Sequence, residues 1–172
     1  MVHPDDIPRF AALGVAATIQ PLWAGWEAQM RDLTVPFLGP ARTAWQYPFA
    51  SLARSGARLV GGSDWSVSTP NVVAEVEVAV NRVVPGSRGA EPPFLPDERI
   101  DLEAALRAFT SGGAWIHRLD GVAGSLEPGM LADLVVLDRD LFDRGAGEVG
   151  DARVAFTMIE GAAVFADPAL AW

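Results

Sequence analysis

The residue with the clearest chemical potential in this sequence is Asp64. It follows a short apolar run at residues 57–63, and Trp65, Ser66 and Ser68 come soon after it. Parallel α/β enzymes place a catalytic group at the carboxyl-terminal edge of the sheet in this way, on a buried strand that ends in an acid. Asp64 is therefore the candidate catalytic residue. The alternative is a turn or helix-capping carboxylate, which short polar side chains commonly supply.

The residues after Asp64 are candidates for a substrate pocket. An indole and two hydroxyls, from Trp65, Ser66 and Ser68, stand next to the candidate catalytic group. The alternative is that Trp65 belongs to the core and that the serines cap a helix. Both interpretations stay open from the sequence.

The composition excludes several kinds of chemistry. The 172 residues carry 22 acids and 13 basic residues, all of them arginine, for a formal net charge of -9. A field of this sign repels polyanions, so we expect no nucleic-acid partner. The absence of lysine and cysteine excludes Schiff-base and thiolate catalysis, disulfides and cysteine zinc sites.

Membrane association and a histidine-rich metal site are also not expected. The sequence has no run of about 18 apolar residues, and its start does not resemble a signal peptide, so we expect a cytoplasmic protein. His3 and His117 are the two histidines. Histidine ligands come in convergent sets, so we interpret His3 as a residue near a frayed terminus and His117 as a packing or helix-end residue.

Two strands and their helices have to position Asp64. Residues 15–20 and 58–63 are apolar on both faces of the pleat, which is typical of parallel strands covered on both sides. Between them, residues 22–40 predict a loop with some helix and residues 41–55 predict a helix. The valine-rich residues 70–84 predict a helix capped by Ser68 or Thr69, on which Glu75 and Glu77 are expected to be simple polar positions.

The spacing of apolar residues changes from helical to strand-like in the second half of the sequence. A proline-rich loop at residues 85–97 precedes a helix that Asp101 can cap and that Gly112 and Gly113 weaken or end. Residues 132–137 predict a strand. Residues 153–159 and 162–165 flank a Glu-Gly pair and predict a β-hairpin.

Three segments stand out together: GVAATIQP at residues 14–21, GGSD at residues 61–64 and GSLEPGMLADLVVLD at residues 124–138. In this order they resemble the amidohydrolase superfamily, and more narrowly its branch of YtcJ-like predicted metal-dependent hydrolases. The resemblance covers almost the whole chain. It implies an α/β fold that is the C-terminal part of a metal-dependent (β/α)8 (TIM) barrel, with part of a small β-domain.

The resemblance also implies a division of the chain and a role for Asp64. Residues 1–99 would form a partial barrel with strands seven and eight, and residues 100–172 would form a connecting helix and the strands of the β-domain. Asp64 matches the aspartate after strand eight, which binds a divalent metal, zinc above all, and accepts a proton from water. The other ligands of the family, including a His-x-His pair on strand one, are expected before Met1.

These expectations leave three functions open. The first is a portion of a metal-dependent amidohydrolase that hydrolyses non-peptide C–N bonds of a small molecule and is inactive alone. The second is a non-catalytic structural or interaction protein derived from such an enzyme. The third is a small-molecule binding module. Open strand edges and unpartnered apolar helices predict a homo-oligomer or a complex with the missing N-terminal half.

Overall fold

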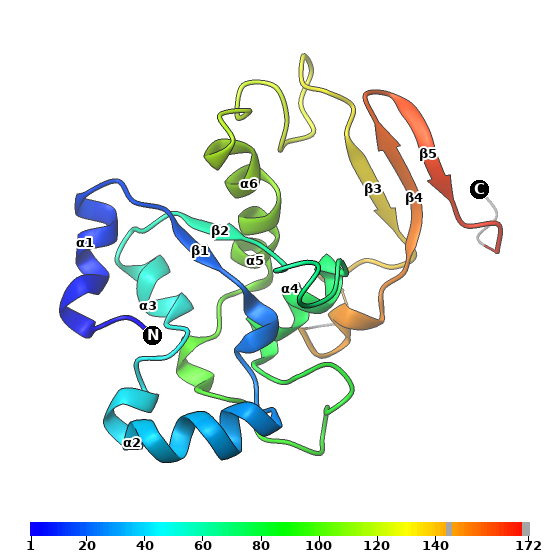
Figure 1. The fold of residues 1–172 in the computed structure, drawn as a ribbon. Helices are drawn as coiled ribbons and strands as arrows, with labels where there is room; N and C mark the ends of the chain where they lie inside the picture. Colours follow the sequence, from blue (N-terminus) through cyan, green and yellow to red (C-terminus); the bar gives the residue numbers. More distant parts are fainter. Residues whose placement is uncertain (144–145, 170–172) are drawn as a thin grey trace.

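The fold contains two separate sheets joined through helices. The computed structural model describes residues 1–143 and 146–169. Two strands pair in parallel in the order β1-β2, and three pair antiparallel in the order β3-β4-β5. The two sheets lie on opposite sides of helices α5 (Leu102–Phe109) and α6 (Ser111–Ile116), with the antiparallel sheet at the edge of the molecule (Figure 1). The strands are β1 (Ala17–Ile19), β2 (Leu59–Gly61), β3 (Leu134–Leu137), β4 (Val154–Ile159) and β5 (Ala162–Ala166).

The protein is α/β, and its parallel pair is a partial barrel. Strands β1 and β2 coincide with the two predicted parallel strands, and the described residues do not close a barrel around them. Ala17 pairs with Leu59 and Ile19 with Gly61. Ala17 and Ile19 are buried on one face of β1, and Val60 is buried in β2. Thr18, on the other face of β1, is exposed, so the prediction that this strand is covered on both faces was wrong for the described residues.

Helices and helical turns fill most of the remaining chain before residue 120. Several are only one or two turns long because proline and glycine interrupt them. In chain order they are η1 (Pro4–Asp6), α1 (Ile7–Ala12), η2 (Pro21–Trp23), η3 (Gln29–Thr34), α2 (Val35–Thr43), α3 (Phe49–Arg54), α4 (Val72–Asn81), η4 (Pro96–Glu98), α5 (Leu102–Phe109) and α6 (Ser111–Ile116), with η5 (Ala146–Asp151) later in the chain.

Helix α4 begins and ends differently from the prediction. Its cap is Asn71, whose side chain accepts the backbone N–H groups of Val73 and Ala74. The prediction of a Ser68 or Thr69 cap was therefore wrong, because the chain turns further after Pro70 before the helix begins. The helix ends at Arg82, which adopts left-handed backbone angles with φ of 60°.

Two other helix predictions were wrong in their boundaries. The helix predicted at residues 41–55 is broken at residues 44–48, where Tyr47 has a positive φ of 45° and Pro48 precedes α3. Gly112 does not end a helix but lies inside α6. A Cβ atom at Gly112 would stand 2.7 Å from the carbonyl oxygen of Leu59, so glycine lets α6 approach β2 closely.

The predicted hairpin and the predicted α5 cap are confirmed. Strands β4 and β5 are joined by Glu160 and Gly161, both at positive φ, as expected for a two-residue hairpin turn. The Asp101 side chain accepts the Ala104 N–H at the start of α5. Strand β3 pairs with β4 and completes the small sheet.

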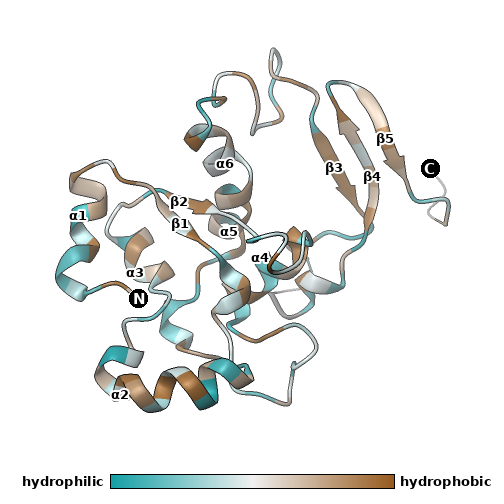
Figure 2. Ribbon diagram, viewed as in Figure 1, coloured by the Kyte–Doolittle hydropathy of each residue, from teal (hydrophilic) through white to brown (hydrophobic). Residues whose placement is uncertain are grey.

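The core surrounds α4, whereas much apolar surface is uncovered elsewhere. From Ala74 to Val80 every residue of α4 is buried. In contrast, every residue of β5 is exposed, and Val164 and Phe165 are among the large exposed apolar side chains. Figure 2 shows hydrophobic residues along β3, β4 and β5 at the edge of the molecule. The described residues therefore leave both faces of β5 without a covering layer.

We expect Phe94→Ala to destabilise the chain strongly. Phe94 is 1% exposed and packs edge-on against Trp26 at 4.8 Å between ring centroids. The lost packing and the cavity together cost about 3–5 kcal/mol. Denaturant unfolding followed by circular dichroism measures this. Phe37→Ala is the control, because Phe37 is 74% exposed, and equal effects of the two variants would contradict the packing described here.

Candidate functional site

The carboxyl-terminal ends of β1 and β2 form one edge, and the candidate site lies there. The two strands are parallel and in register, and the Gly62 N–H donates to the Ile19 carbonyl at 2.9 Å. Residues from Gln20 onward follow β1 at this edge, and residues from Gly62 onward follow β2. The pairing therefore brings the segment around Leu22 and the segment around Asp64 to the same end of the sheet.

A tight turn holds the backbone of Asp64. Its φ is 61°, and its carbonyl accepts the N–H groups of Val67 and Ser68 at 2.7 and 3.1 Å. The Trp65 N–H donates to the Ser63 hydroxyl at 3.2 Å. Among the described residues none donates a hydrogen bond to the Asp64 carboxylate, which is half-buried. The turn thus fixes the backbone of Asp64, and its carboxylate has no hydrogen-bond donor among the described residues.

The predicted pocket residues lie in this same turn. The Ser68 hydroxyl donates to the Ser63 carbonyl, so it closes the turn around Asp64. Trp65 is 66% exposed, so it does not belong to the core, and Ser66 is exposed beside it. The structure therefore places Trp65, Ser66 and Ser68 next to Asp64. Their contact with a substrate stays a prediction.

Sequence reasoning missed a second carboxyl group of this region, Glu75. It lies on α4, is 0% exposed, and accepts the Leu22 N–H through Oε2 at 2.7 Å. Burial raises the pKa of Glu75 to about 7, and the charge of Asp64 adds to the increase while the Leu22 N–H opposes it. Its Oε1 is buried with no hydrogen-bond partner among the described residues. Glu75 therefore links α4 to the segment after β1.

The described residues do not by themselves fit a metal ion. They contain no group of three or more histidine, aspartate or glutamate side chains arranged to hold one. His3 caps η1 by accepting the Asp5 N–H and packs against Trp45 at 4.7 Å between ring centroids. His117 is exposed at the end of α6. A catalytic zinc needs three protein ligands, and Asp64 is the single candidate here.

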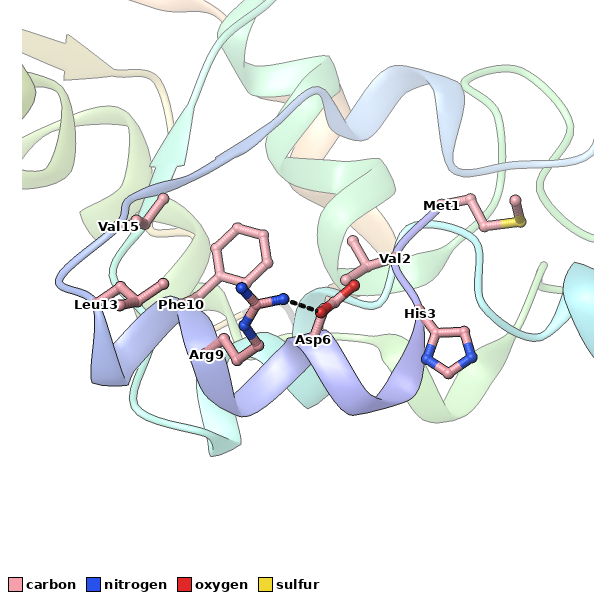
Figure 3. Close-up of a pocket in the computed structure, with 8 residues that line it drawn as sticks. All are labelled: Met1, Val2, His3, Asp6, Arg9, Phe10, Leu13 and Val15. Carbon is pink, nitrogen blue, oxygen red and sulfur yellow. Dashed lines mark hydrogen bonds and ion pairs between the residues drawn. The ribbon is translucent and has the colours of Figure 1, made fainter.

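A separate cavity of about 370 Å³ lies over η1 and α1, at the amino-terminal end of β1 (Figure 3). Its walls are largely apolar, from residues such as Phe10, Leu13 and Val15, and the Arg9–Asp6 ion pair at 2.5 Å crosses it. Asp64 follows the opposite end of the parallel pair. The cavity therefore does not contain the candidate catalytic residue.

The comparisons with known proteins agree on one family. A model of the amidohydrolase family matches residues 1–165, so the chain belongs to this family. Two curated relatives are "Protein LONG AFTER FAR-RED 3" of Arabidopsis thaliana, 35% identical over 92% of this chain, and the N-substituted formamide deformylase of Arthrobacter pascens, 32% identical over 67%.

Solved structures of metal-dependent amidohydrolases share the fold. An uncharacterised metal-dependent hydrolase of Pyrococcus horikoshii is 27% identical with a TM-score of 0.66, over 81% of this chain and 27% of its own length. An adenosine deaminase of Xanthomonas campestris with bound zinc has a TM-score of 0.64 at 21% identity, over 96% of this chain and 35% of its own. The first of these two proteins is described as metal-dependent, and the second holds zinc.

The chain is much shorter than these proteins. It spans 26% of the length of the Arabidopsis relative and 20% of the length of the deformylase. The partial barrel is consistent with a fragment of the larger fold. Separately, none of the helices in the described part of the chain is long and apolar enough to cross a membrane.

Glu75 should make the stability of the fold depend on pH. A carboxyl whose pKa is raised from 4.5 to about 7 on folding stabilises fully below pH 4.5, and this contribution is lost as the pH rises through about 7. Relative to Glu75→Gln, the wild-type unfolding free energy should fall by up to about 3 kcal/mol between pH 4.5 and 8. Chemical denaturation across this range, with exposed Glu103→Gln as control, measures the difference. A constant difference would contradict the buried state of Glu75.

Proposed function

We propose that this chain is the C-terminal portion of a metal-dependent amidohydrolase of the YtcJ-like branch, which hydrolyses non-peptide C–N bonds of a small molecule. The observation that carries this proposal is Asp64, a carboxylate without a hydrogen-bond donor among the described residues, at the carboxyl ends of a parallel pair in an amidohydrolase fold. Amide and cyclic amide bonds are the proposed substrate class. The curated deformylase relative, whose name describes action on N-substituted formamides, supports this class.

The proposed role of Asp64 is proton transfer. A carboxylate held by its backbone can accept a proton from an attacking water molecule and pass it to the leaving nitrogen. The divalent ion expected from the family, with zinc favoured, would supply water activation. The described residues offer it one ligand, so we assign the remaining ligands to a part of the fold outside this chain and derive only the action of Asp64.

The uncovered apolar surface supports a partner. Strand edges in the parallel pair and the exposed faces of β5 are surfaces that proteins normally cover. We propose that the chain is active only when joined to the missing part of the barrel, and that alone it associates with itself through these surfaces. A cytoplasmic location stays a prediction.

A non-catalytic role is the second candidate. The observation that favours it is the absence of any metal-ligand cluster in the described part of the chain. In that case the chain would act as a structural protein that uses the former barrel surface as an interface, and Asp64 would be an inherited turn residue. Loss of Asp64 would then have no catalytic effect in any assembly.

In an active assembly that contains this chain, Asp64→Asn should lower kcat by at least about 100-fold, the size expected when a positioned proton acceptor is lost. The isosteric amide keeps the turn but cannot take the proton. Steady-state amide hydrolysis measures the effect, and exposed Asp97→Asn serves as the matched control. If the two variants retain similar kcat, Asp64 has no catalytic role.

The isolated chain should not be a monomer. At micromolar concentration its mass by size-exclusion chromatography with light scattering should exceed the 18.3 kDa of one chain. Val164→Asp, on an exposed face of β5, should reduce the association, whereas Asp167→Asn should not. A strictly monomeric wild type would refute the proposed use of the open surfaces.

A further inference from the structure

The strongest unexplained feature is the environment of Glu75. Its side chain is fully buried on α4, and its Oε2 accepts the Leu22 N–H from a segment 53 positions earlier in the chain. This hydrogen bond joins the helix that follows β2 to the turn that follows β1. It therefore connects the two segments at the edge where Asp64 lies.

The second carboxylate oxygen of Glu75 is not explained by a purely structural role. Its Oε1 has neither solvent nor a hydrogen-bond partner among the described residues. A buried polar atom without a partner costs free energy whether the carboxyl is ionised or protonated. The fold therefore retains Glu75 at a cost that the Leu22 contact alone does not explain.

Glu77 gives an internal comparison on the same helix. It is also fully buried, but its oxygens accept from the Arg88 guanidinium and from the Gly150 N–H. Glu77 thus has its partners within the chain and ties α4 to η5. Glu75, two residues earlier, has one oxygen left over and is close enough to Asp64 for the Asp64 charge to contribute to the raised pKa of Glu75.

We propose that Glu75 is a positioning residue of the hydrolase site. Its Oε2 fixes the Pro21–Trp23 turn beside Asp64. Its Oε1 accepts a hydrogen bond from an N–H or O–H group of the completed site. This inference rests on the proposed function. It assigns to the chain a second contribution to the site, which acts through the neighbouring segment and not on the substrate.

Two substitutions of Glu75 distinguish the role of Oε2 from the role of Oε1. Glu75→Leu removes both acceptors, whereas Glu75→Gln keeps a carbonyl oxygen for the Leu22 N–H and replaces the other oxygen with an NH2 group that cannot accept. Glu77→Gln is the matched control, because it weakens a buried pair on the same helix without touching the Leu22 segment.

The first measurement is amide hydrogen exchange at Leu22 in the isolated chain. We expect exchange at Leu22 to be at least about 10-fold faster in Glu75→Leu, and close to wild type in Glu75→Gln and Glu77→Gln, because only the leucine removes the acceptor. Unchanged exchange at Leu22 in Glu75→Leu would overturn the proposed tie between α4 and the turn. This hydrogen-exchange measurement does not require enzymatic activity, so its result tests the role of Glu75 independently of the proposed function.

The second measurement is steady-state kinetics in the active assembly. We expect Glu75→Gln to lower kcat by about 10-fold with little change in KM, and Glu75→Leu to lower it further. Glu77→Gln should lower thermal stability and leave kcat per folded molecule unchanged. Wild-type kcat in Glu75→Gln would refute the role of Oε1, whereas failure of Asp64→Asn to lower kcat would refute the proposed function instead.

Discussion

Helix α4 carries the constraint on which the arrangement depends: three ionisable side chains that are completely buried. Glu75, Glu77 and Arg82 have no solvent exposure. Burying charges costs several kcal/mol each unless partners compensate. Their partners lie in different segments. Glu75 accepts from the Leu22 N–H, and Glu77 accepts from Arg88 and from the Gly150 N–H. Arg82 donates to the carbonyls of Phe94 and Tyr47. Movement of any of these segments would leave a buried polar group without its hydrogen-bond partner.

This constraint connects the site to the rest of the fold. Through Glu75, α4 holds the turn after β1, and through Glu77 and Arg88 it holds the connection to the small sheet, where Asp151 also pairs with Arg88 at 2.6 Å. Arg82 lies against the rings of Phe49 and Phe94, and its burial lowers its pKa to about 10. The parallel pair is short, but it is fixed at its carboxyl-terminal end by contacts that hydrophobic packing alone does not provide.

Much of the fold could be predicted from the sequence, because its signals are local. Apolar runs marked β1 and β2, a capping aspartate marked α5, and Glu160-Gly161 marked the hairpin. The amidohydrolase segments gave the family, which the family model confirms. The close approach of α6 to β2 at Gly112 is a tertiary contact that the spacing of apolar residues does not contain. The break before α3 had a local signal that the prediction overlooked, because Pro48 disfavours helical angles at Tyr47.

The site was only partly predictable. A strand that ends in an acid indicated Asp64, but Glu75 and Glu77 were interpreted as ordinary polar positions, and that interpretation was wrong. A signal was present: the helix is apolar on almost all sides, and such a helix is buried, so its acids must be buried too. Which partner each acid finds could not be predicted, since Leu22 and Gly150 are distant in sequence.

We propose that Asp64 is one ligand of a metal site that the described residues do not complete. Elemental analysis of the purified chain, alone and joined to the remaining part of the barrel, tests it most directly. The account predicts no stoichiometric divalent metal in the isolated chain and at least about one ion per chain in the assembly, lost in Asp64→Ala. A stoichiometric ion in the isolated chain, or an active assembly that holds no metal, would contradict it.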